Sequence, residues 1–343
     1  MKKRLLGVID ATTLFEGLSE LTPHRSVAAI PFGGRYRLID FILSNMVNCG
    51  IQSVAIFPKY QYRSLMDHLG SGKNWELDRK RDGLFFFPSP ELEKPMNGIG
   101  SFEHIAANID FLNRSTQEYV LVSNVNTIFN IDFYPLLNWH IESGCEITEV
   151  RKDGVPLEIY LLKKDLLLEL IHTRHDTGYL NIRDVAMDIN SPYQLCAYHY
   201  EEYAKKIFTI QDYYSASMDL LNPKIWKQLF HKDRPILTKV KDEPPTIYLK
   251  TAIVHNSMVA NGAIIEGTVE NSIIARGVKI AKGAVIRNCI IMQKTQIGEG
   301  CVLEHTILDK DVRIDSGVTI IGTKEKPEIL RKGSIVKGAW VNS

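Results

Sequence analysis

The C-terminal part of the sequence repeats aliphatic residues at intervals of five and six positions. Over residues 269–320 the intervals run 5, 6, 6, 5, 6, 6, 5, 6, 6, so that every three intervals add up to 17. Such a period, with glycines between the aliphatic positions, is typical of a parallel β-helix with three short strands per coil. Residues one coil apart, such as Ile274, Ile291 and Leu308, should then stack on one another. The pattern predicts a left-handed parallel β-helix of hexapeptide repeats over residues 253–343.

This β-helix indicates an oligomerisation or regulatory domain. Stacked coils share one continuous core but leave open strand edges at both ends, and such prisms tend to pair with another chain. We therefore expect association through the repeats, including self-association. The alternative is an acyltransferase site between two β-helices. That site would need a histidine at a coil corner, and His305 is the histidine that lies well inside the repeats.

The chain before the repeats alternates short apolar runs with helical patterns from Arg4 to about Ile171. Strands that alternate with helices form a mostly parallel sheet with right-handed crossovers. This part is therefore expected to be an α/β domain that ends near residue 240, followed by a linker over 241–252 that contains two prolines. Strands are expected at 5–9, 53–57, 84–87 and 119–123, and helices at 36–50, 101–112 and 161–171.

Charge and cysteine content exclude several classes of protein. Lys and Arg number 41 against 40 Asp and Glu, so no overall field would attract nucleic acid or a membrane surface. No run approaches the roughly 20 apolar residues of a membrane span. The cysteines lack a C-x-x-C pair, so we expect no disulfide and no zinc site, but buried, reduced thiols in a cytoplasmic protein. The five cysteines are Cys49, Cys145, Cys196, Cys289 and Cys301.

The loop after the first expected strand lies where α/β domains bind nucleotides. A glycine-rich loop at this point could hold phosphates with its backbone N–H groups beside a helix N-terminus. Here the loop starts with Asp10, ends with Glu16 and contains no glycine before Gly17. The position suits a nucleotide, whereas the chemistry of the residues does not.

One segment carries a specific resemblance to a known family. Residues 31–41, PFGGRYRLIDF, resemble PFGGKYRIIDF of the glucose-1-phosphate adenylyltransferase (ADP-glucose pyrophosphorylase) family. The resemblance implies a Rossmann-like (GT-A-like) nucleotidyltransferase domain over residues 1–240 that joins ATP and glucose 1-phosphate to give ADP-glucose and diphosphate. Further short matches occur at 43–45, 68–70, 75–79, 213–214, 218–221, 256–257, 269–272 and 276–278.

The residues that this family needs for its chemistry are replaced. Phosphoryl transfer depends on positioning and on neutralising the phosphate oxygens, here with a glycine-rich loop, an arginine, a lysine and carboxylates that hold Mg²⁺. The loop aligns with 9–14, the lysine with Val27 and the sugar-site glycine with Glu158. The two metal carboxylates align with Asn126 and Lys206. Because Mg²⁺ requires anionic oxygen ligands, neither a metal nor another cofactor is expected.

The resemblance therefore implies a GlgD-type, non-catalytic subunit of bacterial glycogen synthesis. Such a subunit would join a catalytic GlgC-type adenylyltransferase subunit in a hetero-oligomer, expected to be a tetramer, and tune ADP-glucose synthesis. Losing a single charge contact to the transition state costs on the order of 100-fold in rate. The alternative is a weakly active adenylyltransferase, which would need replacement metal ligands such as Asp10 and Asp132.

Two groups of residues are candidate sites. Arg35 and Arg37 lie in a segment that the family uses for sugar-phosphate effectors, so they are candidates for an anion site that takes a sugar phosphate or a nucleotide. Solvated or salt-bridged arginines are the alternative. A remnant nucleotide and sugar pocket is also expected, although backbone packing alone could explain its glycine. The residues expected in this pocket are Asp10, Gln61, Gly100, Ser101, Asn126, Glu158 and Lys206.

Overall fold

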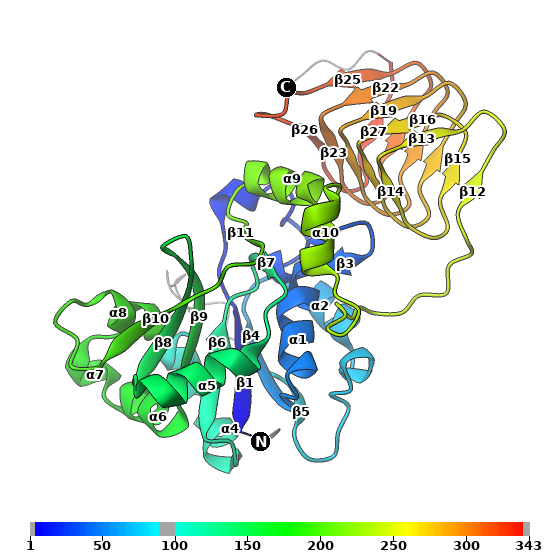
Figure 1. Cartoon of the computed structure of the whole chain (residues 1–343). Helices are drawn as coiled ribbons and strands as arrows, with labels where there is room; N and C mark the ends of the chain where they lie inside the picture. Colours follow the sequence, from blue (N-terminus) through cyan, green and yellow to red (C-terminus); the bar gives the residue numbers. More distant parts are fainter. Residues whose placement is uncertain (1–3, 89–99, 339–343) are drawn as a thin grey trace.

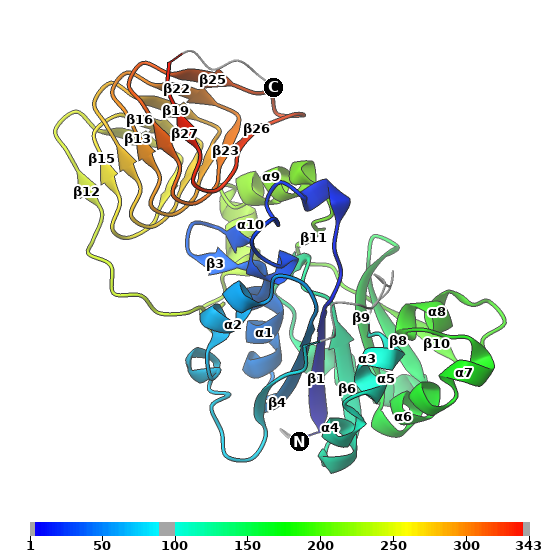
Figure 2. The same ribbon diagram turned by 180° about the vertical axis from the view of Figure 1, so that it is seen from behind.

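The protein consists of an α/β domain and a three-sided β-helix, joined by an extended segment that runs outside both (Figures 1 and 2). The structure is a computed structural model that describes residues 4–88 and 100–338. The expected domain ends at residues 1 and 343 lie outside the described residues. The expected fold class, a mostly parallel sheet followed by a hexapeptide β-helix, is confirmed.

Seven strands form the central sheet of the α/β domain in the order β10-β8-β9-β6-β1-β4-β5. Strand β9 pairs antiparallel with β6 and β8, and the other neighbours in this sheet are parallel. The carboxyl ends of β1 and β6 therefore lie at the same edge of the sheet. The strands are β1 (Leu5–Ala11), β4 (Ser53–Pro58), β5 (Gly83–Phe86), β6 (Tyr119–Ser123), β8 (Ile147–Lys152), β9 (Val155–Lys163) and β10 (Leu195–His199).

Alternating side chains give this sheet two apolar faces. Successive residues of a strand point to opposite sides, so Val8 and Ile9 of β1 belong to different cores. Helices cover both faces, as Figures 1 and 2 show from opposite sides. On the face of Ile9 pack α1 (Leu38–Asn48), α2 (Arg63–Leu69) and α5 (Phe133–Ser143). On the face of Val8 pack α3 (Phe102–Ala106), α4 (Ile109–Arg114), α6 (Lys164–His172) and α8 (Ile182–Met187).

All three expected helices have different limits from those predicted. The helix expected at 36–50 spans Leu38–Asn48, because residues 36–37 form a short strand. The segment 101–112 forms α3 and α4 rather than one helix, because Asn108 leaves the helical conformation between them. Residues 161–163 belong to β9, and α6 begins only at Lys164. The remaining elements are α7 (Arg174–Thr177), α9 (Ile210–Asp219), α10 (Pro223–Leu229), β2 (Pro31–Phe32), β3 (Tyr36–Arg37), β7 (Thr127–Phe129), β11 (Ala204–Lys206) and 3₁₀ turns at Glu16–Leu18, Val27–Ala29 and Lys73–Trp75.

The repeats form three parallel sheets with the predicted register. Ile274 pairs with Ile291, and Ile291 with Leu308, one coil further on. The first sheet contains β12 (Ile247–Tyr248), β15 (Ile264–Ile265), β18 (Lys279–Ile280), β21 (Gln296–Ile297), β24 (Arg313–Ile314) and β27 (Ile335–Val336). The second contains β13 (Ile253–His255), β16 (Thr268–Glu270), β19 (Val285–Arg287), β22 (Val302–Glu304) and β25 (Thr319–Ile321). The third contains β14 (Met258–Val259), β17 (Ile273–Ile274), β20 (Ile290–Ile291), β23 (Thr306–Leu308) and β26 (Glu328–Leu330).

The β-helix begins earlier than residue 253. Strand β12 already pairs with β15, so residues expected in the linker form the first strand of the prism. The apolar pair in β12 precedes the run of regular intervals, and the period alone therefore did not include it.

The third sheet of the β-helix packs against the α/β domain. Ile273, Ile290 and Ile307 form an outward ladder that belongs to the core of the α/β domain, while their neighbours point into the prism. Helix α9 lies against this sheet in both views (Figures 1 and 2). Its Tyr214 donates a hydrogen bond from Oη to the carbonyl of Asn288 at 2.7 Å. The two domains therefore share buried apolar surface and bury polar groups in hydrogen bonds.

The prediction of reduced thiols is wrong for two cysteines. Cys145 and Cys196 form a disulfide, although 51 residues separate them in the sequence. Parallel pairing of β8 with β10 brings their Cα atoms to 6.0 Å, which spacing in the sequence cannot show. Cys49, Cys289 and Cys301 are free and buried, as predicted. No helix in the described part of the chain is long and apolar enough to cross a membrane.

A buried ion pair joins the domains and provides a stability test. The Arg25 guanidinium donates from Nη1 and Nη2 to both carboxylate oxygens of Asp309, at 2.9 and 3.0 Å. Asp309→Asn would leave Arg25 buried and unpaired, so we expect a loss of about 3–5 kcal/mol in the free energy of unfolding. The matched control, Glu270→Gln, breaks the exposed pair with Arg287 and should cost less than about 1 kcal/mol. Urea unfolding followed by fluorescence would measure both, and equal losses would contradict the expectation.

Candidate functional site

A cavity of about 380 Å³ lies at the carboxyl ends of β1 and β6. The loop after β1, the turn after β6, the start of β9 and helix α8 form its walls, which is the position where the first loop suggested a nucleotide. Its side chains are Thr13, Leu14, Phe15, Asn124, Asn126, Glu158, Arg183, Asp184, Met187 and Phe208. Of the residues expected in the remnant pocket, Asn126 and Glu158 line this cavity, and Lys206 contacts Glu158.

The Glu158 carboxylate is engaged by three neighbouring side chains. Lys206 Nζ lies 3.3 Å from Glu158 Oε1, and Arg183 Nη1 lies 3.6 Å from the same oxygen. Asn124 Nδ2 donates to Glu158 Oε2 at 3.0 Å. Burial lowers the pKa of Lys206, and the negative charge of Glu158 opposes this shift. Lys206 also donates to the carbonyl of Pro156 at 3.1 Å, so its ammonium group is held in place from two sides.

Glu158 has the backbone conformation of a glycine. Its φ of +57° lies in the left-handed region, where a residue with a Cβ is strained by about 1–3 kcal/mol. The family resemblance places a glycine at this position. The left-handed backbone at Glu158 agrees with the glycine that the resemblance implies, and the side chain places a carboxylate beside Lys206 and Arg183.

The residues that align with metal ligands do not fit Mg²⁺. Asn126 is buried, and its Nδ2 donates to the carbonyl of Ile207 at 3.3 Å, while Ile207 N donates back to the Asn126 carbonyl at 2.8 Å. Lys206 brings a positive charge to the position of the second carboxylate. Mg²⁺ is bound through anionic oxygens in octahedral geometry, and an amide committed to the backbone with an adjacent ammonium group cannot supply them. Among the described residues, no three His, Cys, Asp or Glu side chains gather as a metal cluster.

Asp10 lies beside Gly100, and its carboxylate is engaged in local hydrogen bonds. Its carboxylate accepts hydrogen bonds from Thr12 N at 2.8 Å, Thr12 Oγ1 at 2.6 Å and Gly100 N at 2.8 Å. Burial raises the pKa of Asp10, and these hydrogen bonds oppose the shift. Gly100 has a φ of +69°, and a Cβ there would approach Val122 Cγ1 at 3.0 Å. This close packing supports the structural explanation for the glycine.

The other candidate residues lie away from the cavity walls. Ser101 caps α3 by accepting a hydrogen bond from His104 N at 3.4 Å. Gln61 is exposed, and its carbonyl accepts from Ser26 N at 3.2 Å. Asp132 caps α5 by accepting from Tyr134 N at 2.9 Å, so this candidate metal ligand serves a helix terminus. Asp10 and Asp132 therefore both have structural hydrogen-bond roles.

Arg37 belongs to a group of cations between the two domains. We call Arg25, Arg37, Lys241, Arg276 and Lys310 the interdomain cation cluster. Burial, together with the positive charges of Arg25 and Arg276, lowers the pKa of Arg37 to about 10, although Asp40 opposes this shift. Burial, together with the positive charges of Arg37 and Arg25, lowers the pKa of Lys310 to about 7, although Asp309 opposes this shift. The mutual repulsion of these cations marks a place where an anion would be stabilised.

Arg35 stands at the edge of this cluster. Its side chain is exposed, and its guanidinium carbon lies 5.4 Å from the centre of the Tyr36 ring. The Arg35 carbonyl accepts a hydrogen bond from Arg276 Nη2 at 2.9 Å. Arg37, by contrast, is half-buried and donates from Nη1 to the Ser64 carbonyl at 2.6 Å. The two candidate effector residues therefore have different environments.

Sequence reasoning missed several residues of both sites. Arg183 and Asp184 lie on α8, in a segment whose sequence carries no motif for this position. Lys241 and Lys310 are distant in sequence from Arg37 and only the domain contact brings them near it. Arg276 was visible as part of a family match, and Arg25 precedes the position of the missing lysine by two residues. Arg276 and Arg25 are therefore the two residues of the cation cluster that the sequence could have indicated.

His305 has a structural role at the domain boundary. Its Nδ1 lies 2.8 Å from Tyr214 Oη, and the two rings lie 6.1 Å apart between centroids. The histidine that an acyltransferase site would need is thus occupied by a contact to α9 of the same chain.

Comparison with known proteins agrees with this architecture. The nucleotidyl transferase family model matches residues 16–157, and the GlmU-like C-terminal hexapeptide model matches 247–333. The glycogen biosynthesis protein GlgD of Bacillus subtilis (strain 168) is 52% identical over 340 residues, 99% of each chain. GlgD of Geobacillus stearothermophilus is 56% identical over 336 residues, 98% of each chain.

A second group of relatives is more distant. The glucose-1-phosphate adenylyltransferase of Geobacillus stearothermophilus is 29% identical over 328 residues, 84% of each chain. That of Clostridium novyi (strain NT) is 30% identical over 329 residues, 83% of this chain and 85% of the relative. The end-to-end match at more than half identity, together with the two domains, shows that the chain belongs to the family of GlgD glycogen biosynthesis proteins, relatives of glucose-1-phosphate adenylyltransferase.

Proposed function

We propose that this protein is a regulatory, catalytically inactive subunit of ADP-glucose pyrophosphorylase in the cytoplasm. It joins a catalytic GlgC-type subunit and tunes the synthesis of ADP-glucose for glycogen. The observation that carries the proposal is the ion pair of Lys206 with Glu158, 3.3 Å apart in the cavity. An ammonium group stands where the resemblance requires a metal carboxylate, and a carboxylate stands where it requires the sugar-site glycine.

The charged side chains of the cavity neutralise one another, so they are not free to neutralise the phosphate groups of a substrate. Phosphoryl transfer needs cations or metal ions on the phosphate oxygens. Lys206 and Arg183 both contact Glu158, so a substrate phosphate would have to displace this carboxylate and then lie close to it. Like charges at such a distance in a partly buried site repel strongly. The arrangement is therefore stable without substrate and unsuited to the transition state.

The surface of the β-helix supports assembly with other subunits, including a hetero-tetramer and self-association. Ile253, Ile321 and Ile335 lie on its strands with 60%, 55% and 60% of their surface exposed. Aliphatic side chains on open strands favour contact with another β-structure. A catalytic homologue with the same repeats would offer a matching surface.

The interdomain cation cluster supports a regulatory anion, either a sugar phosphate or a nucleotide. Its positive charges come from both domains, so an anion bound there would contact both. A ligand that binds one arrangement of the domains better than another shifts their equilibrium in proportion to that difference. This is how the site could pass a signal to a partner subunit.

Co-expression with the catalytic homologue from the same source tests the partnership. We expect a mixed oligomer by native mass spectrometry, with turnover or effector response changed relative to the catalytic subunit alone. Because the aliphatic strands of the β-helix should form the contact, Ile335→Asp should weaken assembly by about tenfold. Separate homo-oligomers with unchanged kinetics would refute the proposal.

Restoring the two metal carboxylates tests the loss of catalysis. The double variant Asn126→Asp/Lys206→Asp should release diphosphate from ATP and glucose 1-phosphate at less than about 1% of the rate of the catalytic homologue, because the glycine loop and its arginine are still absent. A sensitive diphosphate assay with Mg²⁺ measures this, with the unchanged protein as control. A large gain in the double variant would show that the metal site alone was defective, and activity in the unchanged protein that Asp10→Ala abolishes would favour the weakly active enzyme.

The pH dependence of anion binding tests the cation cluster. The pKa of Lys310 is about 7, below the usual value for lysine, so its positive charge is lost as the pH rises through 7. Sulfate, whose charge is constant in this range, should therefore bind about tenfold more weakly at pH 8.5 than at pH 6.5. Lys310→Met should remove most of this pH dependence, whereas Lys279→Met on the first sheet should retain it. Isothermal titration calorimetry measures the affinities, and a pH-independent affinity in the unchanged protein would contradict the assignment.

A further inference from the structure

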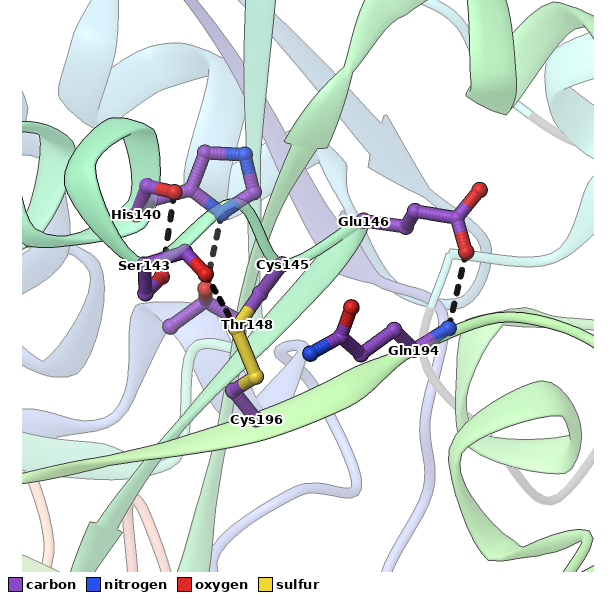
Figure 3. The surroundings of a disulfide bond; sticks show 7 residues. All are labelled: His140, Ser143, Cys145, Glu146, Thr148, Gln194 and Cys196. Carbon is purple, nitrogen blue, oxygen red and sulfur yellow. Dashed lines mark hydrogen bonds between the residues drawn. A yellow bond between two sulfur atoms is a disulfide. The ribbon is translucent and has the colours of Figure 1, made fainter.

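The disulfide holds an edge strand of the central sheet. Cys145 lies between the C-terminus of α5 and the start of β8, and Cys196 is the second residue of β10 (Figure 3). In the described part of the sheet, β10 is hydrogen-bonded to β8 alone, through a short parallel ladder. Beside the disulfide, Gln194 N donates to Glu146 Oε2 at 2.8 Å. The covalent bond therefore secures the end of β10 at which the strand enters the sheet.

The segment anchored by this bond supplies both cations of the cavity. Arg183 precedes Cys196 by 13 residues, and Lys206 follows it by 10. Both side chains contact Glu158, at 3.6 and 3.3 Å. Because Cys196 is covalently fixed between them, the disulfide limits how far the segment 174–206 can move from the sheet.

Of the five cysteines, Cys196 is the only one that is not buried, and Cys145 has 6% of its surface exposed. Cys145 lines a cavity of about 280 Å³ together with Lys163 and Glu146. Cys196 is half-buried on the edge strand. Burial raises the pKa of the Cys49 and Cys289 thiols to about 12, so these two are poor nucleophiles. These two thiols are therefore poor attacking groups toward the disulfide, and exchange at the Cys145–Cys196 pair requires an external thiol.

We propose that the Cys145–Cys196 bond is a reversible thiol–disulfide exchange site for a dithiol reductant, and that its reduction releases β10 and loosens the segment 174–206. This inference does not depend on the proposed regulatory function, because it concerns a chemical modification of this chain alone. Reduction weakens the hold of Arg183 on Glu158, whereas the pairing of β11 with β7 keeps Lys206 in place, and the β-helix is unchanged.

The exchange step balances with the dithiol as the only co-reactant. One thiolate of the reductant attacks Sγ of the half-buried Cys196, the sulfur–sulfur bond breaks, and Cys145 leaves as a thiolate. The second thiolate of the reductant then attacks the reductant's sulfur in the mixed disulfide, which closes the cyclic disulfide and releases Cys196. Two electrons and two protons pass to the protein, and the reductant becomes a cyclic disulfide.

Hydrogen exchange of the full chain, oxidised and then reduced with dithiothreitol, tests the proposal. After denaturation, alkylation should label the 3 free cysteines of the oxidised protein and all 5 cysteines of the reduced one. Amides of β10 and α8 should exchange about tenfold faster after reduction, because local opening no longer has to work against the cross-link. Amides of β1 and of the β-helix should not change.

Two variants separate the disulfide from general effects. Cys145→Ser/Cys196→Ser should exchange like the reduced protein under both conditions, and Cys49→Ser should respond like the unchanged protein. If the double variant does not fold, the comparison of the oxidised and reduced unchanged protein is sufficient. Labelling of all five cysteines after equilibration with oxidised glutathione would overturn the proposal. Amide hydrogen exchange in 174–206 that reduction does not alter would also overturn it. So would an increase in exchange that extends equally to β1, because the disulfide would then stabilise the whole domain rather than this segment.

Discussion

Pairs of consecutive isoleucines in the β-helix, whose two side chains point in opposite directions, determine how the two domains lie relative to each other. In Ile273-Ile274 and Ile290-Ile291, the second side chain fills the prism and the first packs into the α/β domain. Each buried aliphatic side chain contributes about 1.5–3 kcal/mol, so moving the domains apart would expose several of them at once. The interdomain cation cluster depends on this contact, because its members come from both sides.

The candidate site combines the fold of a nucleotidyltransferase-like domain with charged side chains that pair with one another. The sheet, the loop positions and even the left-handed backbone at Glu158 are those of a nucleotidyltransferase-like site. In this cavity the charges of Lys206 and Glu158 compensate each other. A fold and the chemistry of its site can vary separately, because a fold depends on buried apolar contacts and an activity on a few polar groups.

Much of the fold was predictable because its signals are local. The intervals of five and six residues define the β-helix and its register, and the alternation of runs and helices defines the sheet. Several predictions failed where a local signal was missing, including the reduced state of Cys145 and Cys196. The helix at 101–112 is interrupted at Asn108, and the first coil begins at Ile247, ahead of the regular period. At the site, the sequence identified Asn126, Glu158 and Lys206 as replacements but could not show that Lys206 pairs with Glu158.

The sequence by itself determined the two-domain architecture and which residue types stand at the candidate site, because periodicity and residue identity are properties of neighbouring positions. Only the tertiary structure decided which charged and reactive groups meet. Arg25 and Asp309 are separated by 284 residues, and Cys145 and Cys196 by 51. Contacts over such separations follow from strand order and domain packing, which minimise exposed apolar surface over the whole chain. No local pattern records them, and for that reason the cation cluster, the neutralised cavity and the disulfide emerged only from the folded protein.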